Sequence, residues 1–390
     1  MNRYNIGFWN YVQFGTTDIK SAVTDWKELG INLAMSFEYD PDKHKISDVY
    51  LLLDECLKAD IKVILCDKRT IFLSLAEKGE TEFQKGVKAA CSDFAAHPAV
   101  FGFHIGDEPN KTQWNYAEKA FLTVKNCAPN LTPFINFLPY YLDDNFESFV
   151  GVKRENYKER ISEFIQKTGA NLISYDFYGQ CNYFDKDTAI DTYFKNLNLF
   201  REAAFDNDCI FFTSLLSVGH WGYRVPSEDD LRWQINTAVA HGAKGLFWFF
   251  IYERSLDGSY RGSPIDLFWK KTPMYDSLAR QNHIFNDYFA ARLSDYELIS
   301  VEHNLKNYGG TKLFSGNDLL KHISYVINPE PLAISVFQNK TGERCVTIVN
   351  LSQDKPSCVK FEFCDAFEKY NQTCWLAPGQ LCYFSNTEKI

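Results

Sequence analysis

The chain has 390 residues, of which 45% are apolar and 23% are charged, and 41 basic against 50 acidic side chains give a net charge of -9. This composition excludes a disordered tail, a collagen-like fibre and a disulfide miniprotein, and it is typical of a globular protein with a deep core. Net acidity without a stripe of Lys and Arg argues against nucleic acid and against an anionic membrane as partners. A neutral or cationic small ligand fits the charge better.

The cysteines and the first residues bear on the compartment. No segment approaches the roughly 18 consecutive apolar residues that a membrane-spanning helix needs, and the first five residues lead into a strand-like segment rather than the core of a signal peptide. Eleven cysteines without a C-x-x-C pair suit reduced thiols. We therefore expect a cytoplasmic protein that acts away from membranes.

Eight short runs rich in aliphatic and aromatic residues recur in chain order, and each is typical of a buried strand. They are Ile6–Tyr11, Ile31–Phe37, Ile61–Cys66, Val100–Ile105, Pro133–Leu138, Leu172–Phe177, Ile210–Leu216 and Leu246–Ile251. Segments with helical periodicity separate them. The segment after the seventh run has the clearest ends, because Ser227 can cap it, three acids follow in its first turn, and Gly242 follows its last turn.

Strands that alternate with helices pair in parallel through right-handed crossovers, and eight such units close a (β/α)8 barrel. The alternative is an open doubly wound sheet, which usually binds a nucleotide through a glycine-rich first turn. No G-x-G-x-x-G or Walker sequence occurs in the chain, so the barrel is favoured.

After a last helix near residues 273–289 the pattern changes to alternating strands separated by turns, for example at residues 345–349 and 359–363. This pattern predicts a small antiparallel β-sandwich. We therefore predict a barrel over residues 1–295 and a β-sandwich over residues 296–390.

Barrels of this kind carry their reacting residues at the carboxyl ends of the strands, where this chain is rich in carboxylates and aromatic rings. The candidate catalytic residues are Glu108, Asp176, Glu253 and Asp107, and the candidate substrate-binding residues are Tyr11, Glu38, Lys68, Asn136, Tyr140, Tyr178, His220, Trp221 and Tyr252. Paired carboxylates among aromatic rings suit the cleavage of a glycosidic bond, since one acid protonates the leaving oxygen and aromatic faces stack on sugar rings. No metal-spaced Cys or His pair and no serine-hydrolase elbow occurs, so we expect neither a metal nor a cofactor.

The segment at residues 101–110 is the strongest single candidate, because it runs off the fourth strand with Asp107 and Glu108 at its mouth. These acids could instead cap the next helix or pair with Arg69. Gly106 favours a functional role, because it leaves little packing reason for the backbone there unless something must approach closely. Adjacent acids and burial should keep one carboxyl protonated near neutral pH, as a general acid requires.

The same segment carries a resemblance. Gly106-Asp-Glu-Pro109 resembles the strand-four Asn-Glu-Pro signature of the retaining (β/α)8 glycosidase clan, with Asp107 in the Asn position. With three later segments, at residues 175–178, 224–228 and 242–245, it resembles a group of bacterial glycosyl-hydrolase-like barrels that are loosely similar to family-42 β-galactosidases. The resemblance implies hydrolysis of a glycosidic bond, with Glu108 as acid/base, and it implies no particular sugar.

The chain also departs from that clan, whose nucleophile is a Glu at the end of strand seven, because this strand carries no acid. Asp176 is the first choice for the second carboxylate, although it could instead orient Tyr178 or Lys68. Glu253 is the next choice, although an ion pair with Arg254 would explain it equally well.

Three alternatives remain open from the sequence. An adjacent Asp–Glu pair can cleave N-acetylhexosaminides with help from the substrate, the Asp orienting the acetamido group and the Glu acting as acid. A barrel without the strand-seven acid could also bind carbohydrate without cleaving it. Aldolase or isomerase chemistry would need a Lys or a metal cluster at the strand ends, and Lys68 alone supports it weakly.

Overall fold

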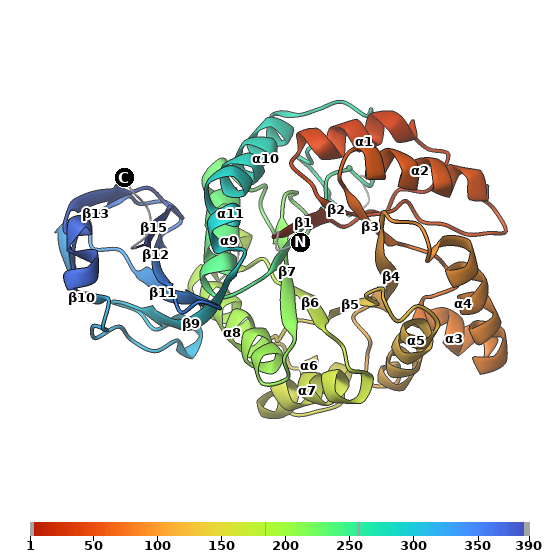
Figure 1. Cartoon of the computed structure of the whole chain (residues 1–390), viewed down its shortest axis with the longest axis horizontal. Coiled ribbons are helices and arrows are strands. Elements are labelled where there is room, and N and C mark those ends of the chain that lie inside the picture. The colour runs from red at the N-terminus through yellow and green to blue at the C-terminus, as the bar shows by residue number, and fades with distance from the viewer. Residues whose placement is uncertain (1–3, 184, 256–257, 386–390) are drawn as a thin grey trace.

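The computed structural model describes residues 4–183, 185–255 and 258–385. Eight strands form one parallel sheet in the order β1-β8-β7-β6-β5-β4-β3-β2, and helices surround it (Figure 1). Asn32 links the two ends of this sheet, since its N–H donates to the Ile6 carbonyl at 3.0 Å and its side-chain oxygen accepts the Ile6 N–H at 2.9 Å. The sheet is therefore a nearly closed barrel, as the sequence predicts.

The eight barrel strands fall within or close to the eight predicted runs. They are β1 (Asn5–Phe8), β2 (Leu33–Met35), β3 (Lys62–Leu65), β4 (Val100–Asp107), β5 (Phe134–Phe137), β6 (Leu172–Asp176), β7 (Ile210–Leu216) and β8 (Gly245–Phe249). Inward side chains in or just after these strands, among them Trp9, Phe134, Phe212 and Phe247, pack together inside the barrel. The barrel is thus filled by side chains and leaves its chemistry to the strand ends.

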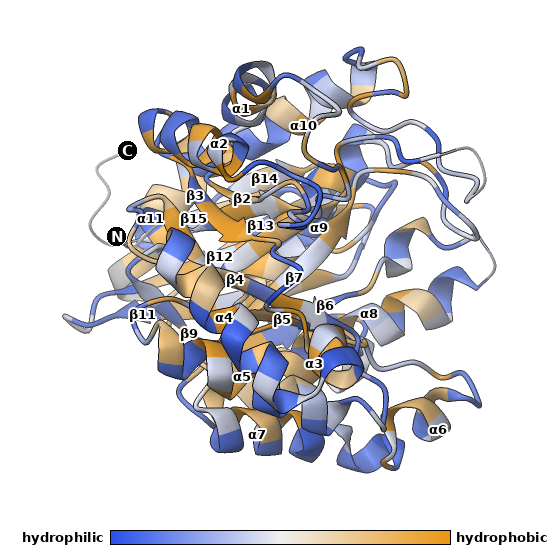
Figure 2. Ribbon diagram, turned by 90° about the vertical axis from the view of Figure 1, so that its right-hand side faces the viewer, coloured by the Kyte–Doolittle hydropathy of each residue, from blue (hydrophilic) through white to orange (hydrophobic). Residues whose placement is uncertain are grey.

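The helices cover the outside of the barrel. They are α1 (Ile19–Glu28), α2 (Ile46–Lys58), α3 (Phe72–Lys78), α4 (Glu80–Phe94), α5 (Trp114–Cys127), α6 (Phe146–Val150), α7 (Tyr157–Thr168), α8 (Lys186–Phe205), α9 (Glu228–Ala240), α10 (Pro273–Ile284) and α11 (Ala291–Leu293). Figure 2 shows that the helices carry both hydrophilic and hydrophobic stretches, whereas most strands are hydrophobic. In α1, for example, Trp26 is fully buried against the barrel.

Helix α9 begins at the Ser227 cap that its sequence predicts, and Asp230 completes a capping box with it. The Ser227 hydroxyl accepts the Asp230 N–H at 3.2 Å, and the Asp230 carboxylate accepts the Ser227 N–H at 2.7 Å. Arg224 also donates to this buried carboxylate, at 2.6 Å. Asp230 therefore holds both the helix start and the loop after β7.

We expect Asp230→Ala to lower the free energy of unfolding by about 2 to 3 kcal/mol, because the change removes a cap and leaves the Arg224 guanidinium without its carboxylate. Asp229→Ala in the same turn is the matched control, since Asp229 is more exposed and its ion pair with Arg232 should contribute less than about 1 kcal/mol. Urea denaturation of both variants measures the difference. Equal midpoints for the two variants would contradict the role assigned to Asp230.

The chain beyond the barrel forms two antiparallel sheets. One has the order β10-β13-β14 and the other β15-β12-β11-β9. Their strands are β9 (Tyr296–His303), β10 (Leu320–Ile327), β11 (Leu332–Asn339), β12 (Arg344–Asn350), β13 (Ser357–Phe363), β14 (Thr373–Leu376) and β15 (Leu381–Ser385). Side chains of both sheets, such as Phe361 and Ile348, share one core. The predicted antiparallel region is confirmed, while the division into units at residue 295 stays a prediction.

These sheets pack beside α8, α9 and α11, on the far side of the barrel from α3 and α4 (Figure 1). The Trp233 indole in α9 donates to the Leu351 carbonyl at 2.8 Å, and the Asn236 amide donates to the Gly379 carbonyl at 2.8 Å. The predicted last helix is longer and less regular than expected, because α10 continues as a π-helix over Phe285–Ala290 before α11. The buried hydrogen bonds made by Trp233 and Asn236 fix the sheets on the barrel.

None of the helices within the described ranges is long and apolar enough to cross a membrane. All eleven cysteines fall within those ranges, and no disulfide joins any two of them. The part of the chain that the structure describes contains no group of three or more His, Cys, Asp or Glu side chains arranged to hold a metal ion.

Candidate active site

Three polar side chains from neighbouring strands meet at the carboxyl end of the barrel. Asp107 ends β4, Asp176 ends β6, and Asn136 lies in β5 between them. The Asn136 amide nitrogen donates to Asp107 at 3.1 Å and to Asp176 at 2.9 Å. The Ser174 hydroxyl donates to the Asn136 amide oxygen at 2.9 Å, which fixes the orientation of the amide. Asn136 therefore holds the two carboxylates at a set spacing.

Glu108 follows Asp107 in an unusual backbone conformation. Its φ is 40°, a left-handed value that non-glycine residues seldom adopt, and its N–H donates to the Asn136 carbonyl at 2.9 Å. Such strain persists only where the surrounding structure imposes it, and it often occurs at functional sites. Gly106 has a φ of 142°, and a Cβ there would lie 2.3 Å from the Phe72 ring. The close approach expected at Gly106 is therefore made by the protein's own helix α3.

Burial raises the pKa of all three carboxyl groups, and neighbouring charges add to it at Glu108 and Asp107. Burial is the largest cause for Glu108, followed by the charges of Asp176 and Asp107, and together they raise its pKa to about 9. Burial and Asp176 raise the pKa of Asp107 to about 7, against the opposing hydrogen bond from Asn136. Burial also raises the pKa of Asp176. Of Glu108 and Asp107, Glu108 is thus the carboxyl that keeps its proton to the higher pH, as a general acid must.

This pKa shift predicts how stability depends on pH. Glu108 has a pKa near 4.5 in the unfolded chain and about 9 in the folded protein, so the folded state holds a proton that the unfolded state has lost between these values. The Glu108 contribution to stability is therefore complete below about pH 4.5 and is lost as the pH rises towards 9. Glu108→Gln copies the protonated form and cannot titrate. We expect it to melt at the wild-type temperature near pH 5 and a few degrees above it near pH 9.

Thermal melts across that range measure the difference between the two proteins. A difference in melting temperature that is the same at both ends of the range would contradict a raised pKa at Glu108. Glu82→Gln on the exposed face of α4 serves as the control and should show no pH-dependent difference.

A cavity of about 340 Å³ opens beside Asp107. Its lining residues are Trp9, Asn10, Tyr11, Gln13, Met35, Glu38, Tyr39, Asp40, Lys43, His44, Cys66, Lys68, Ile71, His104 and Asp107. Asp107 stays accessible to solvent although protein surrounds it, which places it on the cavity floor. Three of the predicted substrate-binding residues, namely Tyr11, Glu38 and Lys68, are therefore brought together with Asp107.

The basic residues at the end of β3 pair with acids other than Asp107 and Glu108. Lys68 pairs with Asp40 at 2.9 Å, and not with Asp67 or Asp107. Arg69 pairs with Asp67 at 2.7 Å and with Asp93 at 2.8 Å. The alternative in which Arg69 neutralises the two acids of β4 is therefore wrong. Asp107 and Glu108 are left to interact with each other and with Asp176.

Buried tyrosines lie near the carboxylates. Burial is the main cause of the raised pKa of Tyr141 and Tyr223, and the charges of Asp176 and Glu108 add to it, which places both hydroxyls near these acids. Tyr178 is buried nearby and stacks on Phe249 with ring centroids 5.6 Å apart. Tyr141 and Tyr223 were missed by sequence reasoning, because nothing in the pattern shows which of several adjacent loop tyrosines turns inward.

His220 and Trp221 differ sharply in exposure. His220 is 1% exposed among aromatic rings, and burial lowers its pKa to about 4, so it is neutral at physiological pH. Trp221 is 68% exposed. His220 is therefore placed to support the aromatic wall behind Tyr178, with ring centroids 6.1 Å apart, rather than to transfer protons.

Three predicted residues are not gathered with this cluster. The Tyr252 hydroxyl accepts the Trp26 indole N–H at 2.7 Å and is buried under α1. The Tyr140 backbone is held by the Asn196 side chain, and its ring packs on Phe146. These contacts give both tyrosines packing roles, because their local surroundings already satisfy them.

The hydrogen bonds of Glu253 go to residues of the segment that follows β8. Its carboxylate accepts the Ser263 N–H at 3.3 Å, and its N–H donates to the Ile265 carbonyl at 2.8 Å. The neighbouring Arg254 lies over the Tyr11 ring at 4.0 Å. Of the two candidates for the second carboxylate, only Asp176 contacts the Asn136 network.

Strand β7 carries no acid, and it holds a small polar network instead. The Ser214 hydroxyl, on β7, accepts the Trp9 indole N–H at 2.8 Å, and Ser214 pairs in register with Asp176 on β6. Trp9 also lines the cavity beside Asp107. This hydrogen bond fixes the Trp9 ring as one wall of the site.

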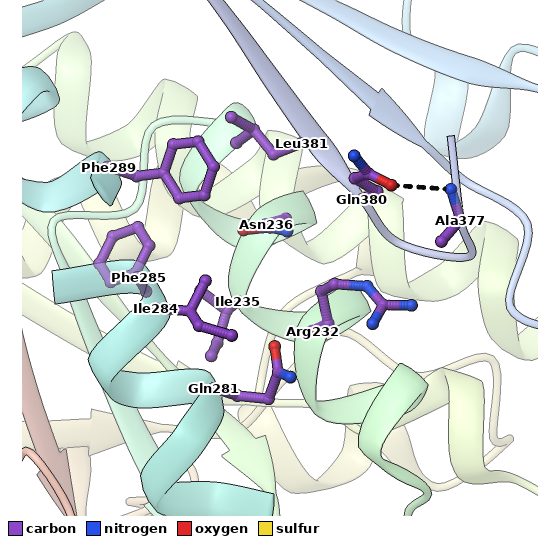
Figure 3. Close-up of a pocket in the computed structure, with 10 residues that line it drawn as sticks. All are labelled: Arg232, Ile235, Asn236, Gln281, Ile284, Phe285, Phe289, Ala377, Gln380 and Leu381. Carbon is purple, nitrogen blue, oxygen red and sulfur yellow. Dashed lines mark hydrogen bonds between the residues drawn. The ribbon is translucent and has the colours of Figure 1, made fainter. Parts of the chain in front are cut away.

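A second cavity, of about 270 Å³, lies far from this chemistry, between the barrel and the C-terminal sheets (Figure 3). Phe285, Phe289, Ile235 and Leu381 face it, and the Gln380 side chain at its edge accepts the Ala377 N–H at 2.9 Å. No carboxylate lines it. It is a packing gap between two regions and not a candidate for acid–base chemistry.

No known protein family matches the sequence, and no curated protein does either. Solved structures share the fold. The β-galactosidase of the psychrophilic Marinomonas ef1 has 10% identity and a TM-score of 0.56, over 72% of this chain and 59% of that one. The cold-adapted β-galactosidase of Rahnella sp. R3 has 13% identity and a TM-score of 0.58, over 77% and 58%. An exo-β-1,4-mannosidase of an Opitutaceae bacterium has 11% identity and a TM-score of 0.50, over 73% and 60%.

The chain thus spans under two thirds of the length of each of these glycosidases. Its fold is similar to that of β-galactosidases and of other glycosidase barrels, and at these identities the likeness shows the fold alone. Function has to be argued from the residues of the site.

Proposed function

We propose that this protein is a glycoside hydrolase that cleaves the glycosidic bond of an oligo- or polysaccharide, with Glu108 as the general acid and Asp176 as the second carboxylate. The observation that carries the proposal is the cluster of Asp107, Glu108 and Asp176 at the carboxyl end of the barrel, where burial raises the pKa of all three and the charge of Asp176 adds to it at Asp107 and Glu108. Two carboxyls with separate protonation states are what glycosidic cleavage needs.

In this proposal the protonated Glu108 donates its proton to the leaving oxygen as the bond to the anomeric carbon breaks. Asp176, which Asn136 holds by a hydrogen bond, either attacks the anomeric carbon or removes a proton from an attacking water. The Asn136 amide nitrogen donates to a carboxyl oxygen of Asp107 and to one of Asp176, and these two hydrogen bonds keep both side chains in place. Trp9 and Tyr11 offer rings on which the sugar could stack.

The second candidate is substrate-assisted cleavage of an N-acetylhexosaminide, and a specific observation favours it. Asp107 lies on the floor of a cavity whose walls include the apolar side chains of Met35, Cys66 and Ile71. Such a pocket could take the methyl group of an acetamido substituent while Asp107 orients its N–H. In that mechanism Asp107 and not Asp176 is essential.

A panel of aryl glycosides, of both anomers and including N-acetylhexosaminides, tests these candidates. Cleavage of one member by the wild type would support hydrolysis, and the configuration of the first-formed sugar, followed by NMR, would distinguish retention from inversion. If the substrate-assisted mechanism holds, Asp107→Asn should abolish activity on N-acetylhexosaminides and on no other glycoside of the panel. A carbohydrate-binding barrel without turnover would give no cleavage of any substrate together with retained binding.

A further inference from the structure

Three loops at the carboxyl end of the barrel are joined by backbone hydrogen bonds. Tyr183, after β6, donates its N–H to the Gly222 carbonyl at 3.0 Å, which links it to the loop after β7. Gly219 and Arg261 exchange two bonds of 2.9 Å, which link that loop to the one after β8. The three loops therefore form a small antiparallel platform, defined here as residues 182–183, 219–223 and 259–261.

Trp221 stands at the tip of this platform in a strained conformation. His220 and Tyr223 exchange backbone hydrogen bonds of 3.1 and 2.7 Å around it, so Trp221 and Gly222 form a two-residue turn. Trp221 has a φ of 43°, a value at which such turns favour glycine. Its N–H donates to the Ser259 hydroxyl at 2.8 Å, yet its side chain is 68% exposed. A large apolar ring at a strained and exposed turn suggests a function rather than a packing role.

A second exposed ring stands next to it in the platform. Tyr183 is 60% exposed and is bonded through its backbone to Gly222, the residue that follows Trp221. Tyr223, in the same hairpin, packs its ring against the buried Tyr178 with centroids 5.7 Å apart, and the charges of Asp176 and Glu108 add to its raised pKa. The hairpin thus connects the carboxylates to the two exposed rings.

We propose that Tyr183 and Trp221 form a stacking platform for the outer sugars of a neutral oligo- or polysaccharide, so that the natural substrate is a glycan chain and not a small glycoside. The proposal rests on the proposed function for its substrate class, and on exposure and loop geometry for the platform itself. Aromatic faces stack on the apolar faces of sugar rings, and a fixed hairpin presents them at little cost in conformational entropy.

Kinetics on oligosaccharides of increasing length test the platform. We expect Trp221→Ala and Tyr183→Ala each to lower kcat/KM for long substrates by about two- to tenfold. The loss should grow with chain length and be smaller on an aryl monoglycoside, which cannot reach the platform. Trp375→Ala on β14, where the ring is also exposed, is the matched control. Equal losses on short and long substrates would overturn the proposal.

A structural role for the Trp221 ring is tested by Trp221→Gly. Glycine suits the positive φ of this turn, so the variant should melt within about 2 °C of the wild type or above it, while it loses the same activity on long substrates as the alanine variant. A clear fall in melting temperature with unchanged activity on long substrates would assign the ring to packing instead.

A binding measurement separates this proposal from the proposed function. Affinity electrophoresis in gels containing xylan, mannan, galactan or β-glucan reports binding without turnover. Retardation of the wild type by one of these polymers, reduced in Trp221→Ala and unchanged in Trp375→Ala, would support the platform even if no substrate were cleaved. Retardation by none of them, or equal retardation of the wild type and Trp221→Ala, would overturn the platform even if aryl glycosides were cleaved.

Discussion

Glu108→Gln should lower kcat on a cleaved glycoside by about a thousandfold or more and should change KM little. Glutamine keeps the shape and the neutral charge of the protonated acid, but it has no acidic proton to give to the leaving oxygen. Because Glu108 is neutral at physiological pH in the folded protein, the substitution disturbs neither the charge of Asp107 nor that of Asp176. Steady-state kinetics of purified wild type and variant on the best substrate of the panel give the comparison.

Leaving-group chemistry adds a sharper test of the same residue. An aryl glycoside with a very acidic phenol needs little protonation, so the variant should recover most of its activity on that substrate while it stays slow on a poor leaving group. Glu82→Gln, on the exposed face of α4, should match the wild type on both substrates. Full activity of Glu108→Gln on the poor leaving group would remove Glu108 from the mechanism.

Asp176→Asn should reduce kcat/KM by roughly a hundred- to ten-thousandfold, because the second carboxylate either attacks the sugar or activates water. Asparagine can still accept the hydrogen bond that Asn136 donates to Asp176, so the network should persist. The expected loss is therefore chemical and not structural. A melting temperature close to that of the wild type at about neutral pH, measured on the same preparation, would establish this.

The same substitution should also move the pH profile. The charge of Asp176 is the second largest cause of the raised pKa of Glu108, so removing that charge lowers the pKa of Glu108. Activity requires Glu108 to be protonated and falls as the pH rises through its pKa, which is about 9 in the wild type. The alkaline limb of kcat/KM for Asp176→Asn should therefore lie at lower pH than the wild-type limb. An unmoved alkaline limb would show that Asp176 and Glu108 do not interact as described.

Much of the architecture follows from local pattern. The eight apolar runs specify the barrel strands because burial on both faces and the helical segments between them leave few other arrangements. The capping box at Ser227 and Asp230 is local as well, since it depends on residues three positions apart. The placement of Asp107 and Glu108 at the mouth of the site follows from their position at the end of the fourth strand.

The partners of those residues depend on contacts between distant segments. Asn136 joins Asp107 to Asp176 across three strands, and neither the bond nor its direction is encoded in any single run. Lys68 pairs with Asp40 although other acids are nearer in sequence, because the loops after β2 and β3 meet at the rim. Loop conformation likewise decides which tyrosine of an adjacent pair turns inward, and it buries Tyr252 against Trp26.

The sequence by itself therefore determined the barrel, the antiparallel region that follows it, and the strand ends at which chemistry can occur, because hydrophobic periodicity and caps act over a few residues. Only the tertiary structure decided which carboxylates lie together, which rings line the cavity, and where Trp221 lies. Those outcomes depend on side-chain directions and distances between strands and loops that are far apart in the chain, and electrostatic coupling falls off too steeply with distance to be inferred from order along the sequence alone.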